Sequence, residues 1–319
     1  MSKNVMIICD KDKNYCNKLD SFIRDNLGIP FNIYEITDAN RLYDFLDDAE
    51  NALLLISEAI FEKNVPHGFK HILVLREKEI SISEEKITYG NDDLNIRYTD
   101  KYQKSENITD SILSMCLDIP GITIKGKSKE PNKKIKVIGF YTPERDVDQT
   151  VEAIRFARKL SDREKTLFIN TDSFCTNELL RNSSYDETIV DLIYFSECAA
   201  DKFGIYLERV VKHDKNLEFV PSSLSPFQCR MIKSKEYKQF IKCVEDTEKY
   251  LNIVLDISEG INELFEILHI CDELYVLQDN RGNDHQRIGL LINELQKDEE
   301  FDMKKLHRIE KAGGEIIGA

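Results

Sequence analysis

Short apolar runs alternate with amphipathic segments along most of this 319-residue chain, and this alternation constrains the fold more than any other feature. Five strand-like runs stand in the first part of the chain, at residues 5–9, 31–36, 53–56, 72–75 and 94–98. Segments with helical periodicity separate them; one spans residues 15–27, and another carries Ile108, Ile112 and Cys116 on one face. Strands that alternate with helices form parallel sheets covered on both faces, so the sequence predicts an α/β protein.

The same alternation resumes in the second part of the chain. Strand-like runs stand at residues 134–142, 166–170, 252–256 and 273–277, with 315–317 as a candidate last strand. Between the two parts, residues 119–134 hold two prolines, two glycines and five lysines, and lack both periodicities over most of their length. We therefore predict two doubly wound parallel-sheet domains, residues 1–119 and 135–319, joined by a linker over residues 120–134.

Composition limits the class of protein. Hydrophobic residues make up 41% of the chain, which is enough for a buried core, and no apolar run approaches the roughly 18 residues of a membrane span. The net charge is −14, and acids outnumber bases in both parts, so we expect no nucleic-acid partner. The eight cysteines are scattered singly, which is typical of reduced thiols and argues against a zinc site. These features, together with a strand-like start, predict a cytoplasmic protein without a secretory signal or membrane anchor.

Three polar residues mark strand ends in the first domain: Asp10 after the first strand, Ser57 after the third and Lys101 after the fifth. The five strand–helix units resemble the receiver domain of response regulators. The resemblance implies an acid pair after strand one, a phosphorylated aspartate after strand three and a lysine after strand five. Ser57 stands where the aspartate is needed, and a serine cannot form an acyl phosphate. We therefore predict an atypical receiver-like domain, in which Asp10 and Lys101 form a structural ion pair or are solvated strand-end charges.

The second domain carries a different pattern at its strand ends. A strand, a short loop and a helix apolar on two faces are followed by a strand ending in Asn170-Thr171-Asp172 and a later strand ending in Asp256. This order resembles the MinD/ParA family of P-loop ATPases over roughly residues 134–319. The resemblance implies that Asp172 and Asp256 could support a metal and a nucleotide, whereas Asn170 replaces the first acid of the family's pair. The alternative is that both acids serve as strand-end caps or hydrogen-bond acceptors.

The loop before the buried helix departs from that family. A phosphate loop uses glycines for close backbone approach, a lysine for the phosphates and a hydroxyl for Mg²⁺. On the family's pattern, Glu144 stands in place of the early lysine, and Arg145, Asp146 and Asp148 stand in place of the three glycines. Gln149 replaces the main lysine, and Thr150 alone keeps the expected hydroxyl group. A phosphate about 4 Å from one of these carboxylates would be repelled by about 4 kcal/mol, whereas the helix N-terminus contributes only about 0.3–1 kcal/mol. We therefore expect no cofactor, neither standard ATP binding nor hydrolysis.

An atypical receiver joined to a MinD-like domain is similar to one subgroup, the TadZ/CpaE type, which localises the tight-adherence (Flp) pilus machinery. The resemblance implies a non-catalytic adaptor that forms a homodimer, contacts pilus or secretion proteins and is recruited by them to the cytoplasmic membrane or pole. The alternative is an ATP-dependent dimerising switch, an ATPase with an unconventional loop that uses Thr150, Asp172 and Asp256 with ATP and Mg²⁺. A transcriptional regulator is disfavoured because a strand, not a helix-turn-helix motif, begins near residue 135.

Overall fold

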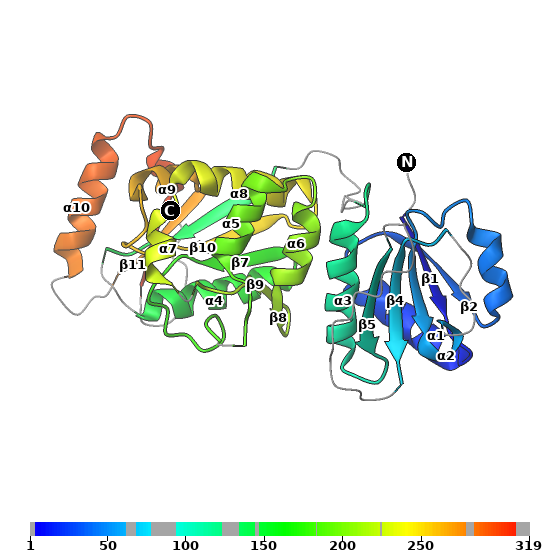
Figure 1. Ribbon diagram of the computed structural model, residues 1–319. Coiled ribbons are helices and arrows are strands. Elements are labelled where there is room, and N and C mark those ends of the chain that lie inside the picture. Colours follow the sequence, from blue (N-terminus) through cyan, green and yellow to red (C-terminus); the bar gives the residue numbers. More distant parts are fainter. Residues whose placement is uncertain are drawn as a thin grey trace. The chain divides into compact units, whose positions relative to one another are not determined.

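The computed structural model describes residues 4–61, 68–77, 94–122, 134–143, 147–182, 184–223, 225–278 and 284–310. The chain divides into two compact units, Met1–Ile124 and Lys125–Ala319, here called unit 1 and unit 2 (Figure 1). Each unit contains one sheet, and each is described by itself.

Unit 1 holds a five-stranded sheet with the order β2-β1-β3-β4-β5, in which every pairing is parallel. Its strands are β1 (Asn4–Cys9), β2 (Phe31–Ile36), β3 (Leu53–Ser57), β4 (His71–Arg76) and β5 (Asn95–Asp100). This order is one of the two common doubly wound arrangements, and it brings the carboxyl ends of all five strands to one edge. The expected parallel α/β architecture is confirmed.

Two layers cover the sheet of unit 1 because its strands are apolar at nearly every position. Alternate residues of β1, Val5, Ile7 and Cys9, join a core cluster with the 3₁₀ helix η1 (Ala39–Phe45) and the short helix α2 (Glu58–Phe61). The residues between them point to the opposite face. Helices α1 (Lys13–Asn26) and α3 (Ser105–Asp118) lie there and contact each other.

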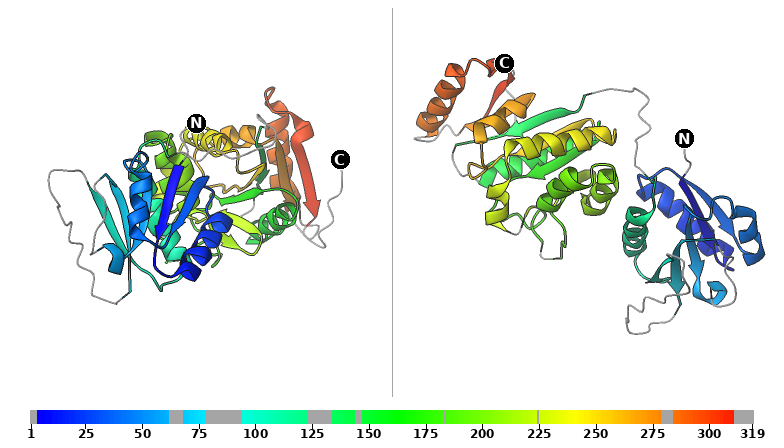
Figure 2. Two further views of the ribbon diagram at one scale, coloured as in Figure 1. Left: turned by 90° about the vertical axis from the view of Figure 1, so that its right-hand side faces the viewer. Right: turned by 45° about the horizontal axis from the view of Figure 1, so that its top comes forward.

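Unit 2 holds a seven-stranded sheet with the order β12-β11-β6-β10-β7-β9-β8. Its strands are β6 (Lys136–Phe140), β7 (Thr166–Asn170), β8 (Lys212–Asp214), β9 (Leu217–Val220), β10 (Asn252–Asp256), β11 (Glu273–Gln278) and β12 (Leu306–Glu310). All pairings are parallel except that of β8 with β9. Strand β12 forms one edge of the sheet (Figure 2). The candidate strand at residues 315–317 lies outside the described residues.

Helices cover both faces of this sheet (Figure 1). On one face α4 (Val147–Ser161) packs Ala153, Ile154 and Ala157 against alternate residues of the central strands. The opposite face is covered by α5 (Ile189–Cys198), α6 (Phe203–Val210), α8 (Ser234–Asp246), α9 (Leu264–Ile270) and α10 (Asp284–Lys297). The short helix α7 (Pro226–Met231) follows β9. None of the helices in the described ranges is long and apolar enough to cross a membrane.

Gly139, in the strand β6, lies at a closely packed point of unit 2. A Cβ atom on this residue would lie 2.6 Å from Cys271 Sγ and 3.0 Å from Ile257 Cδ1. Cys271 is fully buried, so its sulfur has little room to move. The absent side chain is therefore required by the packing between β6 and the segment that leads into β11.

Replacing Gly139 with alanine should lower the free energy of unfolding by about 1–3 kcal/mol, because the new methyl group overpacks a filled core. Urea denaturation measures this change. The matched control is Gly289→Ala in α10, where a Cβ meets nothing within 4 Å and should stabilise the helix by about 0.5–1 kcal/mol. Adding Cys271→Ala to Gly139→Ala should recover part of the loss; a double variant less stable than the single one would contradict the packing explanation.

Glu218 on β9 is the centre of a buried ionic network in unit 2. Its carboxylate accepts from Lys165 Nζ at 2.6 Å and Tyr250 Oη at 2.7 Å, and Lys249 Nζ lies 3.0 Å away. Burial by itself would raise the pKa of Glu218, but the two lysines and the tyrosine outweigh it and lower this pKa to about 2. The carboxylate is therefore more stable in the folded chain than in the unfolded one.

The sign of this pKa change predicts acid sensitivity. The usual pKa of 4.5 falls to about 2 on folding. The stabilisation, about 3 kcal/mol, is therefore present above pH 4.5 and is lost as the pH falls towards 2. Glu218→Gln should lose a similar amount at pH 7 and show a flatter dependence of stability on pH between 5 and 2. Glu299→Gln, at an exposed position, is the control; equal pH profiles for wild type and Glu218→Gln would refute this account.

Candidate functional site

The candidate site of unit 2 lies where the chain reverses its direction of winding. Strand β10 lies between β6 and β7, and the chain leaves β6 towards α4 on one face but leaves β10 towards α9 on the other. Doubly wound sheets bind ligands at such a point, beside the carboxyl ends of the strands. A pocket of about 350 Å³ opens there, and its lining includes Thr142, Gln149, Thr150, Asp172, Ser173, Phe174, Arg230, Asp256, Ser258, Glu259 and Gly260.

Asp256, the last residue of β10, is 2% exposed and is held by three neutral groups. Its Oδ1 accepts a hydrogen bond from Gln149 Nε2 at 2.6 Å. Its Oδ2 accepts from Thr150 Oγ1 at 2.7 Å and from Asn170 Nδ2 at 2.6 Å. Burial raises the pKa of Asp256, and the three hydrogen bonds oppose that rise without cancelling it. Among the described residues, the carboxylate is thus stabilised by amide and hydroxyl dipoles and not by a cation.

Gln149 lies in the first turn of α4 and points into the sheet edge. Besides Asp256, its Nε2 lies 3.2 Å from the carbonyl oxygen of Phe140 and 3.0 Å from that of Ile257. The amide thereby joins the end of β6, the end of β10 and the start of α4. A lysine at this position of a phosphate loop would extend towards the β- and γ-phosphates. Gln149 instead uses its donors within the protein.

Asn170, at the end of β7, is oriented by its own neighbours. Its Oδ1 accepts from Ser222 Oγ at 3.1 Å and from the backbone N–H of Asp172 at 3.0 Å. The amide nitrogen must therefore face Asp256. An aspartate at this position would bring a second carboxylate within 2.6 Å of the first, so the neutral amide removes a strong repulsion.

Asp172 lies nearer the pocket opening and accepts hydrogen bonds from its own turn. Its Oδ1 accepts from the backbone N–H of Phe174 at 3.0 Å and from Ser258 Oγ at 3.5 Å. Among the described residues that line the pocket, Arg230 is the one base, whereas three are acids. Glu144, Arg145, Asp146 and the side chain of Asp148 lie outside the described residues.

The donors of the described residues do not fit a magnesium triphosphate. Gln149 and Thr150 both bind Asp256, so the position expected for a phosphate-binding lysine offers no cation. Across the described ranges, no group of three or more histidine, cysteine or acidic side chains is placed to hold a metal ion. The polar side chains of Gln149, Thr150 and Asn170 at the carboxyl edge of the sheet form hydrogen bonds with Asp256.

The carboxyl edge of unit 1 contains a second internally paired cluster. Lys101 Nζ lies 2.7 Å from Asp10 Oδ2 and 2.9 Å from Glu77 Oε1, and the lysine and Asp10 are at most 5% exposed. The ammonium group also lies 4.8 Å from the ring centre of Tyr15. Of the two expectations for Asp10 and Lys101, the structure contains the ion pair.

Ser57 ends β3 and is 2% exposed, so it offers no carboxylate to the edge of unit 1. Asp12 caps α1 by accepting from the backbone N–H groups of Asn14 and Tyr15. Arg76, at the end of β4, lies 4.0 Å from the ring centre of Tyr98. The acids and bases of this edge are therefore engaged with neighbours within unit 1.

Sequence reasoning missed several of these partners. Glu77 was recognisable only as an acid after a strand, and nothing in the pattern indicated that it would pair with Lys101. Arg230 and Phe174 belong to segments without a motif. No sequence pattern indicated the hydrogen bond from Gln149 to Asp256, because the two residues lie 107 positions apart.

No protein-family model and no curated protein matches the chain. Among solved structures, a ParA family ATPase from Chlorobium tepidum TLS is similar, with a TM-score of 0.46 and 20% identity over 55% of this chain and 73% of that one. A plasmid partition protein from Borrelia burgdorferi is similar with a TM-score of 0.43 and 19% identity, over 56% of this chain and 78% of that one. The MinC:MinD cell division protein complex of Aquifex aeolicus is similar with a TM-score of 0.42 and 13% identity, over 55% of this chain and 68% of that one. At these values no residue role and no activity passes from those proteins to this chain.

The Asp256 cluster predicts how substitutions of Gln149 respond to pH. Gln149→Glu places a second carboxylate against Asp256, and two such groups can share one proton but cannot both ionise at low cost. We expect the variant to approach wild-type stability near pH 5 and to lose about 3–5 kcal/mol by pH 8. Gln149→Met should lose stability equally at both pH values. Chemical denaturation across this range measures the difference; a Gln149→Glu variant as stable as wild type at pH 8 would exclude the proposed contact.

Proposed function

We propose that this chain is a non-catalytic localisation or assembly adaptor, resembling the TadZ/CpaE proteins that position the tight-adherence pilus machinery. It acts through protein contacts of a pseudo-receiver (unit 1) and a pseudo-ATPase (unit 2). One observation carries the proposal: Gln149, at the position of the phosphate-binding lysine, donates to Asp256 and to two backbone carbonyl groups.

The charge of the pocket supports this proposal. Asp172, Asp256 and Glu259 line the pocket, and Arg230 is the single base among its described lining residues. A triphosphate carries at least three negative charges, and each close approach of like charges costs about 4 kcal/mol at an effective dielectric constant near 20. One arginine at the rim compensates for only part of this repulsion.

The charge pairing in unit 1 supports the same proposal. Lys101 is already bound by Asp10 and Glu77, and Ser57 supplies no phosphorylatable carboxylate. The edge at which a receiver exchanges a phosphoryl group is therefore occupied by internal ion pairs. Unit 1 then serves as a stable surface for contacts rather than as a switch.

The resemblance also supplies the proposed partners and location. The chain would form a homodimer and would bind pilus or secretion proteins in the cytoplasm. Those partners would recruit it to the cytoplasmic membrane or pole. The proposal includes no nucleic-acid partner, in keeping with the net charge of −14.

Isothermal titration with ATP and Mg²⁺ tests the proposed function. We expect neither binding at micromolar nucleotide concentrations nor phosphate release, because Gln149 offers no cation and the pocket has an excess of acids. Gln149→Lys should also fail to bind, since its ammonium group would pair with Asp256. Sub-micromolar binding accompanied by turnover in the wild-type protein would overturn the adaptor proposal.

A second candidate is an ATP-dependent dimerising switch. The favouring observation is that Thr150 keeps a hydroxyl group 2.7 Å from Asp256 at the mouth of a pocket of about 350 Å³. Light scattering with and without nucleotide separates the two candidates. The switch predicts nucleotide-dependent dimers that Asp256→Ala abolishes, whereas the adaptor predicts the same mass with and without nucleotide.

A further inference from the structure

An exposed surface borders the pocket of unit 2 and combines apolar side chains with one arginine. Phe227 and Met231 on α7 are 74% and 62% exposed, and Phe174 in the turn after β7 is 55% exposed. Residues 227, 230 and 231 share one face of α7 because they are three and four positions apart. Cys229, on the other side, is buried. We call Phe174, Phe227, Arg230 and Met231 the Arg230 surface.

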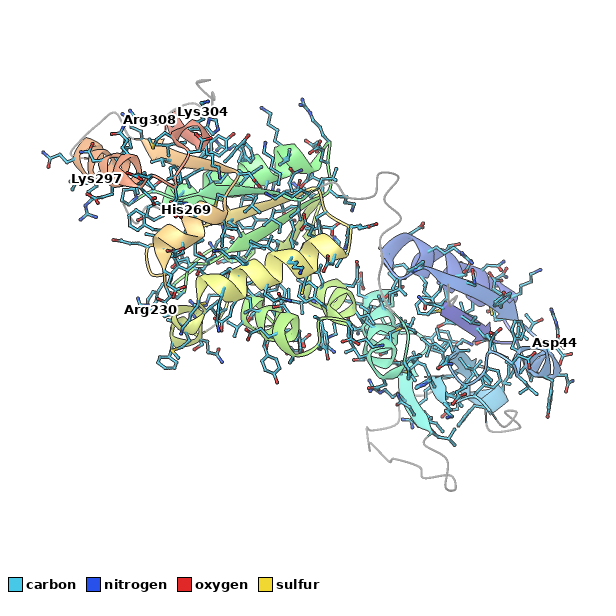
Figure 3. The ribbon with its side chains drawn as sticks, turned by 90° about the horizontal axis from the view of Figure 1, so that it is seen from above. Asp44, Arg230, His269, Lys297, Lys304 and Arg308 are labelled. Atoms are coloured by element: carbon cyan, nitrogen blue, oxygen red, sulfur yellow. The ribbon has the colours of Figure 1, made fainter. Side chains whose placement is uncertain are left out.

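Arg230 has donors to spare on this surface. Its guanidinium carbon lies 5.8 Å from the ring centre of Phe174, and it forms no ion pair with any described residue. The side chain stands on α7 at the outside of unit 2, well apart from Arg308 on β12 (Figure 3). A guanidinium group without a carboxylate partner is suited to recognise one on another molecule.

Ser173 provides a second, independent observation inside the pocket. The residue is 2% exposed and lines the pocket, yet its hydroxyl group has no hydrogen-bond partner in the described part of the chain. Because Ser173 lines the pocket and its hydroxyl group is not bonded to another described residue, this hydroxyl group is available to a ligand.

Ser173 and Arg230 converge on the space beside Gly260. A Cβ atom on Gly260 would lie 3.7 Å from Ser173 Oγ, 3.7 Å from Arg230 Nη2 and 3.5 Å from Ser258 Oγ. Because glycine has no side chain, a gap that a methyl group would fill remains among three polar atoms from three separate segments, beside the pocket that these residues line. Ser258 Oγ already donates to Asp172 Oδ1 at 3.5 Å, so Ser173 and Arg230 are the available donors.

Charge decides which acceptor group this space can take. Asp172 lines the same pocket and repels anions, while Arg230 supplies one positive charge. A carboxylate carries a single charge, which one arginine can neutralise. A phosphate monoester carries nearly two charges, and a triphosphate carries more, so the repulsion grows without further compensation. The apolar side chains around Arg230 would bury the flanks of a ligand, and such surroundings are typical of protein interfaces.

We propose that Arg230 and Ser173 bind a carboxylate side chain of a partner protein in the space beside Gly260. Phe174, Phe227 and Met231 pack against apolar residues on either side of that carboxylate in the partner. The proposal rests on the proposed function in one respect, namely that the chain works through protein contacts, and it assigns one of those contacts to the Arg230 surface.

An NMR titration of the full chain tests the site with 4-phenylbutyrate, which joins a carboxylate to an apolar group. We expect saturable shifts of the Ser173 and Gly260 amide signals and a dissociation constant of roughly 1–10 mM, as befits a ligand of this size. The neutral 4-phenylbutyramide should bind at least tenfold more weakly, and so should acetate. Equal binding of the acid and its amide, or tighter binding of 4-phenylbutylammonium, would overturn the proposal.

Variants assign the binding to particular side chains. Arg230→Gln should weaken 4-phenylbutyrate binding at least tenfold, and Gly260→Ala should weaken it by filling the space while the arginine remains. Arg308→Gln, an exposed arginine on β12, is the matched control and should have no effect. Unchanged binding by Arg230→Gln would refute the site, provided that its melting temperature equals that of wild type.

A double variant tests the apolar part of the surface. Phe227→Ser with Met231→Ser should abolish the advantage of 4-phenylbutyrate over acetate; a retained advantage would show that these side chains take no part. The outcome is separable from that of the nucleotide titration. Tight ATP binding with turnover would end the adaptor proposal and leave the carboxylate result standing, whereas absent carboxylate binding would remove this surface and leave the adaptor proposal standing.

Discussion

The buried carboxylate of Asp256 is the constraint on which unit 2 depends. Asp256 is 2% exposed, and a charge buried to this extent requires either a cation or several hydrogen-bond donors. In this chain the donors are Gln149, Thr150 and Asn170. Two of these groups are amides and the third is a hydroxyl group, so Asp256 carries the one charge in the described part of this cluster. The amides join β6, β7, β10 and α4 into one rigid edge, and a polyphosphate would have to break these bonds to be neutralised there.

Unit 1 solves a similar problem with charges instead of amides. Lys101 lies between Asp10 and Glu77, and it contacts the ring of Tyr15 as well. Breaking such a pair leaves an uncompensated buried charge, which costs about 3–5 kcal/mol, so this edge also resists rearrangement. In both units the strand-end residues at the carboxyl edge stabilise the sheet, and in unit 2 the loops beside them carry the Arg230 surface.

The sheet cores were predictable because parallel strands buried on both faces are apolar at nearly every position. The strands ending at Cys9, Asn170 and Asp256 were recognised in this way, and the α/β architecture followed. In unit 2 the strands at the two sides of the sheet were not recognised. Strand β12 has only Leu306 and Ile309 as apolar residues, because it has a neighbour on one side alone, and the short hairpin of β8 and β9 has too few residues to display a period.

The sequence by itself determined which side chains stand at the strand ends and in the segments that follow them, among them Ser57, Gln149 and Asp256. Only the tertiary structure decided where these side chains form their hydrogen bonds. Gln149 could have faced solvent, but the parallel register places Asp256 beside it although 107 positions separate them. Likewise, Arg230 and Ser173 meet beside Gly260 because three loops converge at one edge of the sheet, and local sequence carries no record of that convergence.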